Sequence, residues 1–190
     1  SISDGMMYNG ACLDFDGTDD VVDTGTDCIG AGAMSVSVWF NADSAGEGTY
    51  GRIITNSKVI IHVATDGSVL FYGNGSTSIS SGASSFAFGN WVHLVCTRDV
   101  SGTSSKIYIN GQQKGSTGDT GSTAAGSTNV TIGNTLATTR TFDGGIADVK
   151  IFGVELSVAQ VTELYNDSKV IIPSNVSQTN LKCWWPLVDG

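Results

Sequence analysis

Hydrophobic and polar residues alternate with a period of two over much of the chain. The stretch MSVSVWF at residues 34–40 places large apolar side chains at the even positions and serines at two odd ones, which predicts a half-buried β-strand. Trp39 then falls on the opposite face from its apolar neighbours. Comparable runs, each bounded by Gly, Asn, Asp or Ser, cover residues 52–55, 58–64, 69–72, 91–98, 106–110, 129–132 and 146–152. Many short strands predict an all-β sandwich or barrel.

Two local signals refine this prediction. The dipeptide Asn110-Gly111 lies between two strand-like runs and predicts a hairpin with a type I′ turn, in which both central residues need positive φ. Residues 156–166 instead have apolar positions at helical spacing, and Ser157 with Gln160 forms an S-x-x-Q capping box. We therefore expect one short helix, followed by an irregular connector over residues 167–180 and a terminal strand over residues 181–190.

Length and charge narrow the class of protein. A chain of 190 residues is expected to form a single domain over residues 1–190. The net charge is −9 with only nine Lys and Arg and no basic run, which disfavours nucleic acids and anionic membranes as partners. No apolar stretch approaches the ~20 residues that span a bilayer, so membrane insertion is not expected. The first residues resemble no signal peptide, and the chain begins without Met, so it is either a processed protein or an excerpt.

The four cysteines are Cys12, Cys28, Cys96 and Cys183, and no CxxC pair occurs among them. This spacing disfavours a zinc site and a thioredoxin-type motif. Two interpretations stay open for these residues: at least one disulfide, or buried thiols in strands.

The motifs, taken in order, resemble the laminin-G-like, concanavalin A-like jelly-roll superfamily, which includes the pentraxins. The resemblance extends from about residue 11 to residue 166 and rests on ACLDFDGTDDVVDTG, SVSVWF, WVHLVCTRD, KIYINGQQKGS and FDGGIADVKIFGVELSVAQVTELYN. It implies a two-sheet antiparallel jelly-roll sandwich with one short helix. It also implies rim loops that in many family members bind carbohydrate, often with the help of calcium.

The last residues, WWPLVDG at 184–190, depart from the family pattern. Family members usually begin with a strand of this type, and nothing before Gly10 fits it. Three interpretations compete: the last strand fills the place of the first, the chain ends at the start of a further repeat, or the strand is lent to a neighbouring subunit in a homo-oligomer. Closure within the chain is favoured because the termini of compact domains usually lie close together. Strand geometry sends Trp184 and Trp185 to opposite faces, so we expect one to enter the core.

Catalysis is not expected. Glycosidases commonly use two carboxylates that face each other across the bound sugar, but the chain has three glutamates and no E-x-D-x-x-E strand. His62 and His93 lie within strand runs, and no G-x-S-x-G elbow occurs. We therefore assign no catalytic residues.

The segment DFDGTDD, residues 14–20, holds four carboxylates in seven residues. One interpretation is the polar turn of a hairpin, because Asp side chains bond their own backbone in turns. The other is a Ca²⁺ site, because calcium takes six to eight oxygen ligands and neutralises clustered carboxylates. Asp16, Asp19 and Asp20 are the candidate ligands, and Asp148 could complete the set through a strand that the resemblance places beside this turn.

Aromatic and polar residues in or beside the predicted rim loops are the candidates for contacting a ligand. They are Tyr50, Arg52, Tyr72, Asn74 and Arg140. Trp39 and Trp91 match positions that the resemblance assigns to core packing.

The sequence thus favours a non-catalytic, lectin-like recognition or adhesion module that binds glycans through its rim loops. Its expected location is extracellular, on a cell surface or on a virion surface. The first alternative is a structural decoration or cement protein of a phage or virus capsid or fibre, with a protein assembly as the partner. A glycoside hydrolase is the minority alternative.

Overall fold

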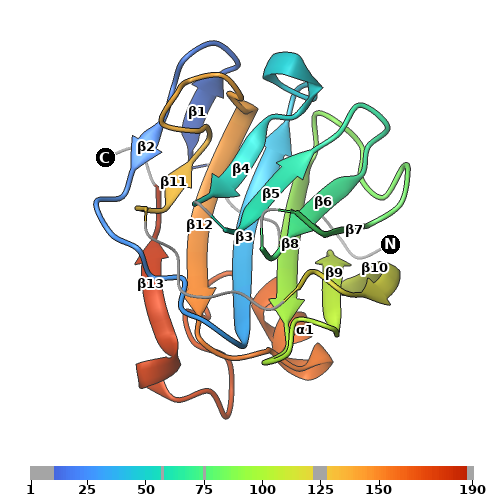
Figure 1. The fold of residues 1–190 in the computed structure, drawn as a ribbon, viewed down its shortest axis with the longest axis vertical. Helices are drawn as coiled ribbons and strands as arrows, with labels where there is room; N and C mark the ends of the chain where they lie inside the picture. The colour runs from blue at the N-terminus through green and yellow to red at the C-terminus, as the bar shows by residue number, and fades with distance from the viewer. Residues whose placement is uncertain (1–10, 57, 75, 122–127, 188–190) are drawn as a thin grey trace.

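The computed structural model describes residues 11–56, 58–74, 76–121 and 128–187, which form two antiparallel sheets packed face to face (Figure 1). Sheet A runs in the order β1 (Leu13–Asp16), β12 (Asp143–Phe152), β3 (Met34–Ala42), β8 (Trp91–Arg98), β9 (Ser105–Ile109) and β10 (Gln112–Gly118), with β13 (Leu181–Trp185) also paired to β12. Sheet B runs in the order β2 (Val22–Asp23), β11 (Thr131–Ile132), β4 (Arg52–Thr55), β5 (Ile60–Val63), β6 (Val69–Tyr72) and β7 (Ser78–Ser80). The expected all-β jelly-roll sandwich is confirmed.

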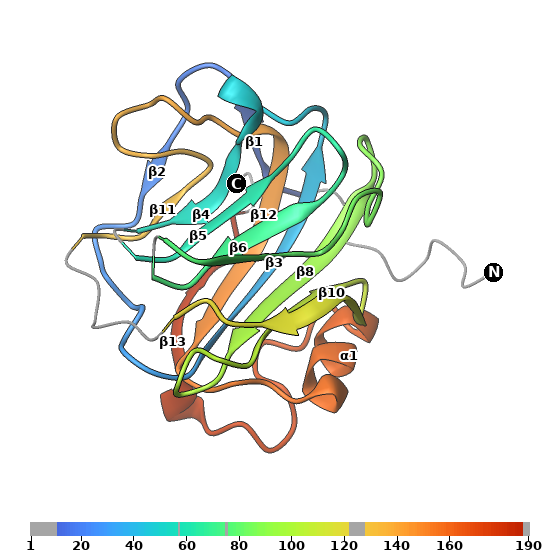
Figure 2. The same cartoon turned by 45° about the vertical axis from the view of Figure 1, so that its right-hand side comes forward.

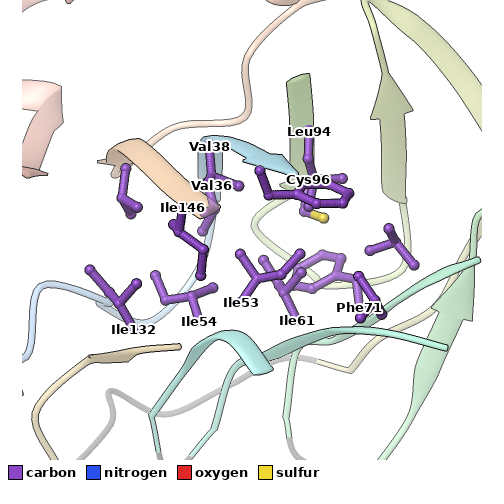
Figure 3. Packing of buried hydrophobic residues seen from close by; sticks show 14 of the residues in the cluster. Val36, Val38, Ile53, Ile54, Ile61, Phe71, Leu94, Cys96, Ile132 and Ile146 are labelled. Carbon is purple, nitrogen blue, oxygen red and sulfur yellow. The ribbon is translucent and has the colours of Figure 1, made fainter. Parts of the chain in front are cut away.

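The core lies between the two sheets (Figure 3). The even-numbered apolar residues of β3 point into it, while Trp39 lies outside that cluster on the other face of sheet A, as the period-two pattern predicts. Facing them from sheet B are Ile54, Ile61 and Phe71, all fully buried (Figure 3). Burial of such side chains contributes about 1.5–3 kcal/mol each, so the strand pattern is also the main source of stability.

The predicted helix is α1 (Val158–Asn166), and its capping box is present as expected. The Ser157 side chain accepts a hydrogen bond from the Gln160 backbone, and the Gln160 side chain accepts one from the Ser157 backbone. The buried face of α1, with Val161 and Leu164, packs on the outer face of sheet A against Val95 of β8. Figure 2 shows α1 beside β8–β10 and away from β4 and β5. Within the described part of the chain, no helix has the length and apolar character needed to cross a membrane.

The hairpin at Asn110-Gly111 joins β9 to β10, and both residues have positive φ, 50° and 76°. This confirms the predicted turn. The sequence pattern missed β7, because this strand has only three residues and two of them are serines. Short 3-10 turns cover Glu47–Thr49 (η2) and Gln178–Asn180 (η3).

The C-terminal segment forms β13, which pairs antiparallel with the second half of β12, while β1 pairs with the first half. Trp185 packs against the core, whereas Trp184 is 40% exposed. A disulfide joins Cys183 of β13 to Cys28, which lies in the segment between β2 and β3. The terminal strand is therefore held within the chain by both backbone pairing and a covalent bond.

The acidic segment 14–20 does not form a hairpin. It begins within β1 of sheet A and leads to β2 of sheet B, so its turn carries the chain from one sheet to the other. The expectation of a hairpin was wrong because turn residues show where a chain reverses and do not show which strands then pair. Pairing partners far apart in sequence decide that.

Candidate functional site

The acidic turn brings three of the predicted metal ligands together. Carboxylate oxygens of Asp16, Asp19 and Asp20 lie within 4.8 Å of one another. Two of these carboxylates also bond the turn itself: Asp16 Oδ1 accepts from the Thr18 N–H at 2.8 Å, and Asp20 Oδ2 accepts from the Asp16 N–H at 3.0 Å. The remaining oxygens are of the type that Ca²⁺ prefers, so these three residues could hold such an ion.

Asp148 does not join this group. It lies beyond the part of β12 that pairs with β1, at an irregularity in the pairing of β12 with β3, with φ at 51°. Its buried carboxylate accepts hydrogen bonds from Lys150 Nζ and, at 2.8 Å, from Trp184 Nε1. Burial lowers the pKa of Lys150, and the neighbouring carboxylate opposes that shift. Asp148 therefore serves as the counter-charge of a buried lysine.

Four of the five predicted ligand-binding residues converge on the outer face of sheet B. Ile61 and Phe71 point into the core, so the side chains one position along each strand, His62 and Tyr72, point away from it. Arg52 is opposite His62 in the β4–β5 register, and Tyr72 is opposite Ile60 in the β5–β6 register. Arg52, His62 and Tyr72 thus share the outer face.

Tyr50 and Arg140 complete this group, which we call the Arg–Tyr cluster: Tyr50, Arg52, His62, Tyr72 and Arg140. The ring centroids of Tyr50 and His62 are 5.3 Å apart, and those of His62 and Tyr72 are 5.8 Å apart and stacked. The Arg140 guanidinium carbon lies 6.0 Å from the Tyr50 ring centroid, at the limit of a cation–π contact. Tyr50 is 47% exposed, while His62 is buried beneath the group. The cluster therefore presents aromatic and cationic groups together to solvent.

The two arginines of the Arg–Tyr cluster lie close enough to affect the pKa values within it. Burial lowers the pKa of Arg52, and the nearby Arg140 lowers it further. The pKa of His62 falls to about 4, first because of burial and also because Arg52 and Arg140 are close. His62 is therefore neutral near pH 7, and its Nδ1 lies 3.0 Å from the Val63 carbonyl oxygen, which accepts a hydrogen bond from it.

Loop packing fixes the position of Arg140. The Arg52 N–H donates to the Arg140 carbonyl at 3.0 Å, which ties the segment before β12 to β4. Gly48, with φ at 61°, lies against the Arg140 guanidinium, and a Cβ there would be 3.1 Å from Nη1. Gly46 also has positive φ, and a Cβ there would be 2.4 Å from the Thr141 carbonyl oxygen. These two glycines let the η2 loop approach Arg140 closely.

Asn74, the fifth predicted ligand-binding residue, lies in a turn. Its side-chain oxygen accepts hydrogen bonds from the backbone N–H groups of Ser76 and Thr77, at 2.9 and 3.0 Å, and shapes the turn after β6. His62 was missed as a member of the cluster because it was considered only as a catalytic residue. The available signal was a polar residue at an outward position of the apolar strand IIHV.

Trp39 packs inside the protein, as predicted. It is 1% exposed and stacks on Tyr165 of α1 with ring centroids 6.1 Å apart. It also lies 5.0 Å from the His93 ring.

A sequence profile of the concanavalin A-like lectin/glucanases superfamily matches residues 16–162, so the chain belongs to this superfamily. A comparison with curated protein sequences found no match.

Several solved structures share the fold. A putative carbohydrate-binding protein from Bacteroides ovatus has a TM-score of 0.64 at 15% identity, over 91% of this chain and 50% of that one, so the chain spans about half of it. The CBM40 domain of the Ruminococcus gnavus IT-sialidase, bound to α2,3 sialyllactose, has a TM-score of 0.65 at 13% identity, over 85% of this chain and 100% of that one. Domain 4 of a GH43 extracellular arabinanase from Geobacillus stearothermophilus, in complex with arabinotriose, has a TM-score of 0.58 at 22% identity, over 73% of this chain and 69% of that one.

Proposed function

We propose that this protein is a non-catalytic glycan-binding module and that the Arg–Tyr cluster is its binding surface. One observation carries the proposal: two tyrosine rings and two arginines share the outer face of sheet B, where no described helix covers β4, β5 and β6 (Figure 1). Aromatic rings contact the apolar face of a sugar, and neighbouring polar groups bind its hydroxyls. Structural neighbours that bind carbohydrate lend support to this assignment.

The glutamates support a non-catalytic role. Glu155 pairs with Lys106 at 2.6 Å, and Glu163 accepts hydrogen bonds from Ser174. Glu47 Oε2 is 3.3 Å from the Thr141 N–H, which donates to it. Each glutamate thus bonds a different part of the fold, which supports the view that they do not act together as acid and nucleophile.

We also propose a secreted or surface location. The Cys28–Cys183 disulfide supports it, because disulfides persist mainly in oxidising compartments.

The test is a glycan array followed by titration calorimetry on the glycans that are retained. Tyr50→Ala should weaken binding about 5- to 30-fold, since removal of a central aromatic contact costs about 1–2 kcal/mol. Val100→Ala is the matched control, because Val100 is 73% exposed and lies outside the cluster. Equal losses in both variants would contradict the assigned surface.

If no glycan is retained, the recognition function is wrong. Co-purification in fixed stoichiometry with a capsid or fibre protein would then support the structural alternative. Release of sugar from any bound glycan would overturn the non-catalytic assignment.

A further inference from the structure

The arginines of this chain are used in two different ways. There are three, in a protein whose net charge is −9. Arg98 is fully buried and donates to backbone carbonyls: Nη1 to Gly73 at 2.7 Å, and Nε and Nη2 to Gly32 at 2.9 and 2.7 Å. The Arg98 guanidinium therefore makes its hydrogen bonds within the protein. The other two arginines, Arg52 and Arg140, both belong to the Arg–Tyr cluster.

Neither of these two has a carboxylate partner within the described residues. The ion pairs there are Lys106–Glu155 and Lys150–Asp148. Arg140 Nη1 donates to its neighbour's carbonyl, that of Thr139, at 2.6 Å. Arg52 Nε is buried and makes no hydrogen bond. Buried donors are normally satisfied, so this nitrogen marks a place where a partner is expected.

The two guanidinium groups are also close enough to disfavour each other's charge, as the lowered pKa of Arg52 reflects. Arginine stays protonated in proteins, so the cluster carries two positive charges and cannot relieve their repulsion by deprotonation. An anion between them would relieve this repulsion. Guanidinium binds planar or tetrahedral oxyanions through paired N–H groups.

Resting on the proposed function, we propose that the ligand is an acidic glycan. Arg52 and Arg140 bind its oxyanion, either a carboxylate or a sulfate ester, while Tyr50 and Tyr72 contact the adjoining sugar ring. The rest of the acidic surface disfavours polyanions at long range, but charges beyond about 8–10 Å are screened at physiological salt. The local pair of arginines therefore decides which sugars bind.

The test uses two pairs of glycans in which one member carries an additional acidic group: a carboxylate on an added sialic acid in the first pair, and sulfate esters in the second. We would compare lactose with α2,3-sialyllactose, and desulfated with sulfated chondroitin oligosaccharides, by calorimetry at 50 and 300 mM NaCl. We expect at least tenfold tighter binding of an acidic member and weaker binding of it at high salt. The first pair reports on carboxylates and the second on sulfate esters, so the result identifies the source of the oxyanion.

Variants test whether the Arg–Tyr cluster causes the preference for acidic glycans. Arg140→Gln should reduce the ratio of acidic-glycan to neutral-glycan affinity at least fivefold, and Arg52→Gln should do the same in protein whose circular dichroism is unchanged. Lys114→Gln is the control, because it removes the same charge from an exposed position on β10. An equal loss with Lys114→Gln would overturn the proposal in favour of general charge attraction.

Failure of this inference can be distinguished from failure of the proposed function. Binding of neutral glycans with no acidic preference would overturn the inference and leave the glycan-binding function intact. Absence of binding to any glycan would overturn both.

Discussion

The outer faces of both sheets carry aromatic, histidine and cationic side chains, but these side chains differ in burial and in ion pairing. On sheet A, Trp39 and His93 lie beneath Tyr165 of α1, and Lys150 bonds Asp148. Trp39, His93 and Lys150 are each no more than 2% exposed. The rings of Trp39 and His93 are covered by the protein and Lys150 has a counter-charge, whereas Trp184 at the β13 edge of this sheet stays 40% exposed.

On sheet B, Tyr50 and Tyr72 flank the buried ring of His62, and Arg52 lies beside them. Tyr50 is 47% exposed, and Arg52 Nε makes no hydrogen bond. Aromatic, imidazole and cationic groups on a sheet therefore do not define a binding surface by themselves. What separates the two faces is whether the protein itself supplies the cover and the counter-charge.

The largest effect should come from Trp39→Ala. Loss of a buried aromatic ring costs about 3–5 kcal/mol, because it removes apolar contacts and leaves a cavity. Tyr50→Ala should cost less than about 1 kcal/mol, since half of that side chain already faces water. Urea denaturation of both variants measures the difference. Equal losses of stability would show that the two faces are equally structural.

The next prediction compares the stability contributions of Lys150, which has a counter-charge, and Arg52, which has none among the described residues. Asp148→Asn leaves the buried Lys150 without a counter-charge and should cost about 3 kcal/mol. Asn also tolerates the positive φ at this position, so the backbone need not change. Arg52→Met should leave the melting temperature unchanged or raise it, because it removes a charge that has no partner. A melting temperature that falls as far in Arg52→Met as in Asp148→Asn would contradict the comparison.

The two histidines predict a dependence of stability on pH. Burial lowers the pKa of His93 to about 3 and that of His62 to about 4, against about 6.5 in the unfolded chain. Below pH 6.5 the unfolded state binds more protons, so stability decreases as the pH falls, toward pH 4 for His62 and pH 3 for His93. The loss should be about 2 kcal/mol per histidine at pH 5.

Chemical denaturation at pH 7 and pH 5 tests this prediction, with His93→Gln and His62→Gln each expected to remove about that amount of the difference. Arg52→Met sharpens the comparison. It should raise the pKa of His62, because Arg52 contributes to lowering it, and leave His93 unaffected. An unchanged pH dependence in both Gln variants would show that carboxylates alone account for the acid sensitivity.

The smallest effect concerns the acidic turn, where charges of one sign also lie together and form no ion pair with any residue that the structure describes. Asp16, Asp19 and Asp20 are clustered, but two of their carboxylates already bond the turn. We expect millimolar calcium to stabilise the protein by less than about 1 kcal/mol, as for a weak extracellular site. Thermal melts with calcium or chelator measure this, with Asp19→Asn as the variant that should abolish it. A shift larger than about 2.7 kcal/mol would instead indicate saturation at about 100 times the dissociation constant.

The sequence by itself determined the local structure. The period of two located most strands, Asn110-Gly111 located a hairpin, and Ser157 with Gln160 located the start of α1. These features depend on neighbouring residues, so they can be read from a short window.

The sequence also supplied four members of the Arg–Tyr cluster, because Tyr50, Arg52, Tyr72 and Arg140 are polar or aromatic residues in or beside predicted rim loops. It could not show that His62 lies among them or that Asn74 is used in a turn. Those roles depend on which residues lie opposite one another across β4, β5 and β6.

Only the tertiary structure decided the long-range relations. β1 and β13 both pair with β12, each with a different half of it. In the second half of β12, Asp148 forms an ion pair with Lys150 and lies away from the acidic turn. Packing of the η2 loop placed Arg140 over Tyr50. The physical reason is that the strand period fixes which face a side chain occupies, whereas strand register and loop closure fix its neighbours, and those depend on contacts between segments as far apart as 155 residues.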